Sequence, residues 1–249
     1  MKIVIPARYA STRLPGKPLA DIAGKPMIAH VWARACEAAP MADVYIAADD
    51  ERILDAVQAF GGQGVMTSAD HPSGTDRIAE VASTLGWADD EIVVNVQGDE
   101  PLIPPALIAL VGEGLAADQK ADMATASTRI MVTEDVLNPN IVKVVSDAFG
   151  YARYFSRSVI PHMRGADVPD VTKYAYQRHI GIYAYKVSTL KTLTALPPTE
   201  VEETEALEQL RALHHGLTIR VAEISEAPPH GVDTEADLNA VRKLVGANA

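Results

Sequence analysis

The sequence has little of what would define several large classes of protein. Cys36 is the only cysteine among 249 residues, which excludes an intramolecular disulfide and a cluster of thiolates around a metal. No apolar run approaches the ~20 residues that a membrane-spanning helix needs. Acidic residues outnumber basic ones, and the net charge of -11 leaves no broad basic surface for nucleic acid. These absences predict a soluble protein that binds neither nucleic acid nor a membrane.

Targeting segments and glycine-rich phosphate loops are missing too. The first residues, MKIVI, begin a strand-like run at once and leave no room for a signal peptide, so we expect a cytoplasmic location. Neither G-x-G-x-x-G nor G-x-x-x-x-G-K-[ST] occurs. This counts against a dinucleotide-dependent dehydrogenase and against a P-loop NTPase.

The first half of the chain alternates between strand and helix patterns. Strand-like runs lie at 2–6, 43–48, 62–67 and 90–99, and helical patterns lie at 26–39, 50–60, 74–85 and 104–117. Such alternation predicts a parallel sheet with right-handed crossovers and helices on both faces. With 48% hydrophobic residues, the chain can bury the core of one α/β domain spanning 1–249.

The pattern changes after about residue 128. Two alternating runs around Gly150 predict an antiparallel hairpin, 161–175 is loop-like, and 178–185 is again strand-like. A helix is expected at 200–214, beginning with a capping box of Thr199 and Glu202. The prediction is an α/β fold with a doubly wound, mostly parallel sheet and a smaller β-rich subregion inserted at 129–190.

The stretch IPARYASTRLPGKPL, residues 5–19, concentrates positive charge in an acidic protein. Arg8, Arg13 and Lys17 follow the first strand, at the carboxyl edge where open α/β sheets bind ligands. The turn at Pro15-Gly16 could fold Lys17 back over that edge. Guanidinium and ammonium groups suit a polyphosphate; the alternative is an ordinary solvated loop.

Two carboxylates stand at positions that suit a metal ion. Asp99 follows the buried strand in VNVQGDEP, and Asp233 precedes a helix that Thr234 and Asp237 can cap without it. Magnesium prefers one or two carboxylates together with phosphate oxygens and water. A turn after a strand and an ordinary helix start remain the alternatives.

Other polar segments carry weaker signals. HPSGTDRIAE (71–80) opens a helix with small residues whose amides could bind a base or a phosphate, although an ordinary helix cap looks the same. In RHIGIYAY, period-2 alternation puts His179 and Tyr183 on one face, as in a strand that lines a cleft or in a polar edge strand. Arg157 could pair with a substrate carboxylate, and Glu208 and Gln209 are ordinary lateral groups of a helix.

These segments occur together, and in this order, in one family. IPARYASTRLPGKPL, DHPSGTDR, VNVQGDEPLI, YFSR, RHIGIYAY, LEQLR and GVDT resemble the 3-deoxy-manno-octulosonate cytidylyltransferases, or CMP-Kdo synthetases, from residue 2 to about 245. The resemblance implies transfer of CMP from CTP to the acidic sugar Kdo, releasing pyrophosphate, for lipopolysaccharide biosynthesis. It also implies dependence on Mg²⁺ and a cytoplasmic homodimer.

The resemblance also implies a role for individual residues. Arg8, Lys17 and Asp99 would be catalytic, and Asp99 and Asp233 would hold Mg²⁺. The CTP-binding residues would be Pro6, Ala7, Arg8, Lys17, Ser73, Gly74, Thr75, Arg77 and Asp99. The Kdo-binding residues would be Arg13, Gln97, Arg157, His179, Tyr183, Glu208 and Gln209. The subregion 129–190 would serve dimerisation and sugar binding.

One segment departs from the family pattern. HMRGADVPDVTKYAYQ (162–177) replaces the aromatic residue and short charged run that many members carry, so 8-amino-Kdo is an alternative acceptor to Kdo. A sialic-acid cytidylyltransferase is disfavoured because the opening loop lacks a Gly-Ser-Lys pattern. A non-catalytic nucleotide-sugar sensor is disfavoured because Lys17 and both aspartates are present.

Overall fold

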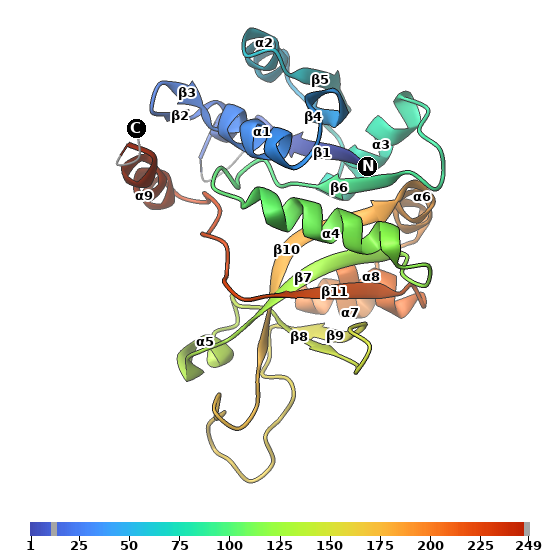
Figure 1. The fold of residues 1–249 in the computed structure, drawn as a ribbon, viewed down its shortest axis with the longest axis vertical. Helices are drawn as coiled ribbons and strands as arrows, with labels where there is room; N and C mark the ends of the chain where they lie inside the picture. The colour runs from blue at the N-terminus through green and yellow to red at the C-terminus, as the bar shows by residue number, and fades with distance from the viewer. Residues whose placement is uncertain (11–13, 247–249) are drawn as a thin grey trace.

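A twisted, mostly parallel sheet forms the centre of the molecule in the computed structural model, which describes residues 1–10 and 14–246 (Figure 1). Along its main path the strand order is β11 (Ile219–Ile224), β7 (Met123–Arg129), β10 (Gln177–Lys186), β6 (Ile92–Asn95), β1 (Lys2–Ala7), β4 (Val44–Ala48) and β5 (Gln63–Met66). β10 is antiparallel to β6 and β7, whereas β6, β1, β4 and β5 are parallel to one another. The predicted fold class is confirmed.

Helices cover both faces of this sheet (Figure 1). In order along the described chain, the helices are α1 (Met27–Ala38), α2 (Glu51–Ala59), α3 (Gly74–Thr84), α4 (Pro105–Ala117), α5 (Thr133–Leu137), α6 (Val187–Ala195), α7 (Glu200–Glu205), α8 (Gln209–His214) and α9 (Glu235–Gly246), of which α9 packs beside the β2–β3 ribbon and not on the sheet. Two 3₁₀ turns, η1 (Lys17–Leu19) and η2 (Met41–Asp43), and a small ribbon of β2 (Asp21–Ile22) with β3 (Lys25–Pro26) complete the first half.

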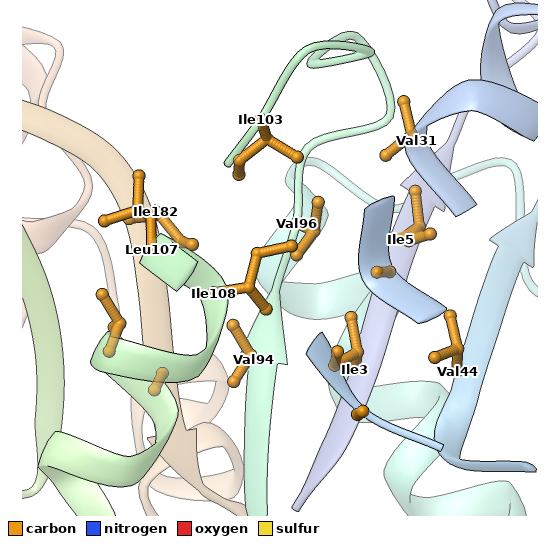
Figure 2. Packing of buried hydrophobic residues seen from close by; sticks show 14 of the residues in the cluster. Ile3, Ile5, Val31, Val44, Val94, Val96, Ile103, Leu107, Ile108 and Ile182 are labelled. Atoms are coloured by element: carbon orange, nitrogen blue, oxygen red, sulfur yellow. The ribbon is translucent and has the colours of Figure 1, made fainter. Parts of the chain in front are cut away.

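The core explains why the first strand is apolar without alternation. Ile3 and Ile5 point to the face covered by α1 and α4 (Figure 2). Val4 points to the opposite face, which α3 and α6 cover. All three side chains are fully buried. Successive strand residues point to opposite faces, so a strand buried on both faces needs apolar residues throughout. The carboxyl ends of β1, β4 and β6 are thereby fixed side by side.

The hairpin predicted around Gly150 is confirmed. β8 (Lys143–Ser146) and β9 (Ala152–Ser156) are antiparallel, and β8 also pairs with the first residues of β10. The segment 161–175 is free of helices and strands, as expected. A separate dimerisation and sugar-binding role for 129–190 stays a prediction.

The helix expected at 200–214 is instead two helices. Thr199 and Glu202 form the predicted capping box at the start of α7. The chain then breaks at Ala206, whose φ of 49° is left-handed. The side chain of Arg157 donates hydrogen bonds to the carbonyl oxygens of Glu205, the last residue of α7, and of Ala206, which caps it. A long-range contact therefore ends the helix, which the local pattern could not show.

Candidate active site

A cavity of about 420 Å³ opens at the carboxyl ends of β1 and β6, against the start of α3. The predicted residues that line it are Pro6, Ala7, Arg8, Lys17, Ser73, Gly74, Arg77, Gln97, Asp99 and Asp233. The structure therefore brings together four segments that are widely separated in the sequence. Arg13 lies outside the described residues.

The turn before Lys17 folds its side chain back over the cavity, as the sequence predicts. Gly16 has a φ of 67°, a left-handed conformation that L side chains rarely adopt. η1 begins directly after it. The Lys17 ammonium donates hydrogen bonds to Asp99 Oδ2 at 2.6 Å and to the Val232 carbonyl oxygen at 2.8 Å. It also lies 3.4 Å from Asp233 Oδ1.

Asp99 reaches this position because β6 and β1 approach closely just before it. A Cβ atom on Gly98 would lie 2.6 Å from the Pro6 carbonyl oxygen, so only glycine fits there without a shift of the backbone. The predicted cap of α9 is also present: Thr234 Oγ1 accepts from Asp237 N, and Asp237 accepts from Thr234 N. The carboxylate of Asp233 is thus left to face Lys17.

The pair Asp99 and Asp233 suits a divalent cation. Both carboxylates approach the same positive group, the Lys17 ammonium, so they are near enough to share a cation. In the described part of the chain, no three His, Cys, Asp or Glu side chains are grouped to hold a metal by themselves. Two carboxylates completed by phosphate oxygens and water are what Mg²⁺ usually has in nucleotide sites.

Glu100 adds a further acidic group that the sequence analysis did not single out. Burial and the neighbouring charge of Asp99 raise the pKa of Glu100 to about 7. Its carboxylate packs against Gly231, where a Cβ atom would lie 2.9 Å from Glu100 Oε1. The glycine of the GVDT motif therefore lets the segment carrying Asp233 approach that carrying Asp99.

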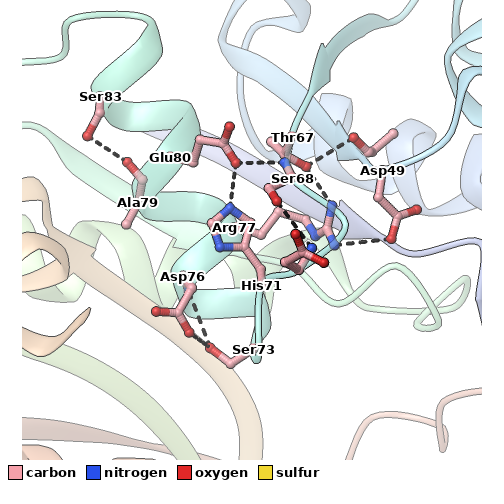
Figure 3. Close-up of polar contacts among 12 residues, drawn as sticks. Asp49, Thr67, Ser68, His71, Ser73, Asp76, Arg77, Ala79, Glu80 and Ser83 are labelled. Carbon is pink, nitrogen blue, oxygen red and sulfur yellow. Dashed lines mark hydrogen bonds and ion pairs between the residues drawn. The ribbon is translucent and has the colours of Figure 1, made fainter. Parts of the chain in front are cut away.

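The start of α3 forms another wall, and its polar side chains are already engaged (Figure 3). Ser73 caps the helix by accepting from Asp76 N, and its hydroxyl donates to Asp76 Oδ2 at 2.7 Å. Arg77 is only 3% exposed and donates to Thr67 and Asp49. The ordinary helix cap is thus confirmed, while the role of this segment in binding the base stays a prediction.

His71 also lines the cavity and was missed. Its Nε2 lies 2.5 Å from Glu80 Oε2, which also accepts from Ser68 N (Figure 3). Burial alone would raise the pKa of Glu80, but the hydrogen bonds from His71 and Ser68 lower it. His71 stands two residues before Ser73, which caps a helix that begins at the sheet edge. This position in the sequence could have predicted that His71 lines the cavity.

A second cavity of about 150 Å³ adjoins the first, since Gly74 and Gln97 line both. The predicted residues that line this second cavity are Gly74, Thr75, Gln97, Tyr183, Glu208 and Gln209. The Thr75 hydroxyl donates to the Glu208 carboxylate. Each of these two residues therefore has a partner before any ligand is bound.

Three other buried polar atoms of the second cavity are unpaired in the described part of the chain. Asn95 Oδ1, Tyr183 Oη and Gln209 Nε2 have no hydrogen-bond partner among the described residues. Buried polar groups are normally paired, because leaving one unpaired costs about 1–3 kcal/mol. An acceptor, a hydroxyl and an amide donor that line one small cavity suit a ligand rich in hydroxyl groups.

His179 lies behind this cavity. Its ring is tilted against that of Tyr183, with ring centres 5.4 Å apart, and its Nε2 lies 3.1 Å from Thr125 Oγ1. Burial, with a smaller effect of the Arg178 charge, lowers the pKa of His179 to about 3. The ring is therefore neutral at physiological pH and supports Tyr183.

Arg157, predicted to bind the sugar, lies outside both cavities. Its guanidinium donates to the carbonyl oxygens of Pro139, Glu205 and Ala206, and the residue lines neither cavity. The pairing of Arg157 with a sugar carboxylate stays a prediction, and it requires these hydrogen bonds to be exchanged.

An open α/β sheet with a cavity lined by cations and two close aspartates at its carboxyl edge defines a nucleotide-binding transferase. The sequence profile of the cytidylyltransferase family matches residues 2–219, and the chain belongs to this family. No helix in residues 1–10 and 14–246 is both long and apolar enough to cross a membrane.

Close relatives sharpen this assignment. The chain is 54% identical over 248 residues to a protein of Idiomarina loihiensis, and the match covers 98% of each chain. It is 55% identical over 249 residues to a protein of Vibrio vulnificus, and this match covers 99% of this chain and 98% of the other. Both relatives are named 3-deoxy-manno-octulosonate cytidylyltransferase. The resemblance found in the motifs is confirmed over the whole chain.

Solved structures agree. CMP:2-keto-3-deoxy-manno-octonic acid synthetase, solved as a complex with CTP, is 46% identical and superposes with a TM-score of 0.92 over 100% of this chain and 99% of that one. A cytidylyltransferase from Leptospira borgpetersenii has a TM-score of 0.63 at 17% identity, covering 99% of this chain and 86% of that one. The latter shows the common fold alone.

Proposed function

We propose that the chain transfers CMP from CTP to the anomeric hydroxyl of Kdo, giving CMP-Kdo and pyrophosphate for lipopolysaccharide biosynthesis. The observation that carries this proposal is the contact of Lys17 with both Asp99 and Asp233 in a cavity that adjoins a smaller one lined by unpaired polar atoms. The first cavity suits a metal-bound triphosphate, and the second suits a sugar. The names of the full-length relatives specify which nucleotide and which sugar.

Arg8 and Lys17 would bind the triphosphate. To do so, Lys17 exchanges part of its contact with Asp99 for phosphate oxygens, and its ammonium then neutralises charge on the leaving pyrophosphate. Asp99 and Asp233 would hold Mg²⁺, which when bound neutralises phosphate charge and makes the attacking hydroxyl more acidic. The new bond joins the sugar oxygen to the α-phosphorus, while the bond to the pyrophosphate oxygen breaks.

Gln97, Tyr183, Glu208 and Gln209 would bind the sugar. Gln97 lines both cavities, so it lies where the sugar would meet the α-phosphate. Glu208 accepts a hydrogen bond from Thr75, which lines the same cavity and follows Gly74, a residue that lines both cavities. Fixing two reactants in adjoining cavities supplies much of the rate of such a reaction.

The assembly and location follow as parts of the same proposal. Met131, Val132 and Leu137, next to or within α5, and Val168 in the adjacent loop are exposed apolar side chains in the subregion 129–190. The Thr133 hydroxyl donates to the Pro169 carbonyl oxygen, which brings these segments together. We expect this surface to be buried in a homodimer, and we place the enzyme in the cytoplasm, where CTP is made.

The direct test measures pyrophosphate release from CTP, UTP, ATP and GTP, each with Kdo, 8-amino-Kdo or sialic acid as acceptor. Release from CTP with Kdo, exceeding every other pair, is the expected result. Faster release with 8-amino-Kdo would keep the nucleotide half of the proposal and change its sugar. Faster release from another nucleotide, or none with any acceptor, would overturn the proposal.

A further inference from the structure

Asp49 directly follows β4 and lies between two walls of the larger cavity. Its side chain is only 6% exposed. Asp49 Oδ1 accepts a hydrogen bond from Tyr9 N at 2.9 Å. Asp49 Oδ2 accepts one from Arg77 Nη2 at 3.1 Å (Figure 3). One carboxylate therefore contacts both the loop that carries Lys17 and the helix α3.

On the loop side, Tyr9 is held in place by two further contacts. The Tyr9 carbonyl oxygen accepts from Gly16 N at 3.2 Å, so the two ends of the loop are joined. The Arg52 guanidinium lies 3.5 Å above the centre of the Tyr9 ring. Arg8 directly precedes Tyr9, and Lys17 directly follows Gly16. The hydrogen bond from Tyr9 N to Asp49 therefore fixes the backbone next to both of these cations.

The helix side carries a buried positive charge. Burial lowers the pKa of Arg77, the charge of Asp49 offsets this effect, and the nearby charge of Arg8 lowers the pKa further. Arg77 Nη1 donates to Thr67 Oγ1 at 2.5 Å, and Thr67 in turn donates to the Ala48 carbonyl oxygen at the end of β4. Without Asp49, Arg77 would be a buried cation close to Arg8, with only the smaller effect of the Glu80 charge to compensate it.

We propose that Asp49 is a positioning residue for the triphosphate. It ties the loop to α3, which keeps Arg8 and Lys17 at the cavity in a binding-competent arrangement before the nucleotide arrives. The inference rests on the proposed function, because it assumes that the larger cavity binds CTP. It extends that function to a residue that touches neither substrate.

The variant Asp49→Asn tests this role, because it keeps the size of the side chain and removes the charge that faces Arg77. Asp43→Asn is a matched control, because Asp43 accepts a hydrogen bond from Lys2 at 2.5 Å. Lys2 begins β1 and Asp43 directly precedes β4, so this pair lies at the opposite ends of the two strands from Asp49. The measurement is calorimetric binding of CTP with Mg²⁺, followed by KM for CTP and for Kdo. We expect CTP to bind at least about 10-fold more weakly to Asp49→Asn, with KM for Kdo unchanged and the control like wild type.

The outcomes separate the two proposals. If wild-type protein does not bind CTP, the proposed function fails. If wild type binds CTP and folded Asp49→Asn binds it within about 2-fold, the positioning role of Asp49 is overturned. If Asp49→Asn does not fold, Asp49→Glu takes its place, since it keeps the charge that faces Arg77 but displaces the carboxylate from Tyr9 N by one methylene; CTP binding within about 2-fold of wild type in this variant would equally overturn the role.

Discussion

The two adjoining cavities differ in whether their polar groups are paired before a ligand binds. In the larger one two of the cations that line it are already paired with carboxylates: Lys17 with Asp99, and Arg77 with Asp49. In the smaller one neutral polar atoms, such as Tyr183 Oη and Asn95 Oδ1, are buried without a partner among the described residues. A nucleotide must therefore exchange existing ion pairs, whereas a sugar would supply hydrogen bonds that are lacking. Changes to the charged cavity should accordingly cost more activity than changes to the neutral one.

The largest effect is expected for Lys17→Ala. The substitution removes the cation that two aspartates face, so turnover should fall on the order of 10³-fold, as when charge stabilisation is lost at a transition state. Pyrophosphate release at saturating CTP and Kdo is the measurement. Lys25→Ala, an exposed lysine of β3, is the control and should leave turnover unchanged. Normal turnover of Lys17→Ala would remove the phosphate-binding role of the lysine.

Asp99→Asn should cost somewhat less, on the order of 10²-fold in turnover. One of the two proposed metal ligands becomes neutral, so the Mg²⁺ concentration at half-maximal rate should also rise. Asp89→Asn is a matched control, because Asp89 pairs with Lys191 at 2.7 Å just before β6, while Asp99 lies just after it. Full activity of Asp99→Asn at ordinary Mg²⁺ would contradict the metal role.

Tyr183→Phe probes the neutral cavity. The hydroxyl has no hydrogen-bond partner in residues 1–10 and 14–246, so its removal should leave the melting temperature unchanged or raise it slightly. The loss of one hydrogen bond to the sugar should raise KM for Kdo about 3–10-fold, with KM for CTP unchanged. Equal effects on the two KM values would show that Tyr183 does not belong to a separate sugar site.

The smallest effect concerns stability and pH. The pKa of His179 is about 3 in the folded chain, against about 6.5 in an unfolded one. Between these values the unfolded chain binds a proton that the folded chain does not, so stability falls as pH falls below about 6.5. From pH 7.5 to pH 6 this group should cost about 1 kcal/mol of unfolding free energy.

Urea unfolding at both pH values measures this contribution. His179→Gln should lose less stability than wild type over that range, while His215→Gln, at an exposed position, should follow wild type. Identical pH dependence in wild type and His179→Gln would contradict the lowered pKa.

Local pattern was enough for the sheet and for most helices. Ile3, Val4 and Ile5 are apolar in succession because both faces of β1 are buried, and this is visible in the sequence. The turn at Gly16 and the cap at Thr234 were also predictable from local chemistry.

Contacts between distant segments were beyond such reasoning. The break at Ala206 depends on hydrogen bonds from Arg157, and the same bonds keep Arg157 away from both cavities. Asp49 directly follows the strand predicted at 43–48, so its place at the sheet edge could have been inferred. Its contacts with Tyr9 and Arg77 required the fold.

The central claim is that Lys17, Asp99 and Asp233 form the centre that receives the triphosphate. A crystal structure of this chain with CTP and Mg²⁺ tests it most directly. We predict phosphate oxygens in contact with Lys17 and Arg8, and one Mg²⁺ bound by both aspartates. A triphosphate lying away from Lys17, or a metal ion that contacts neither aspartate, would contradict the account.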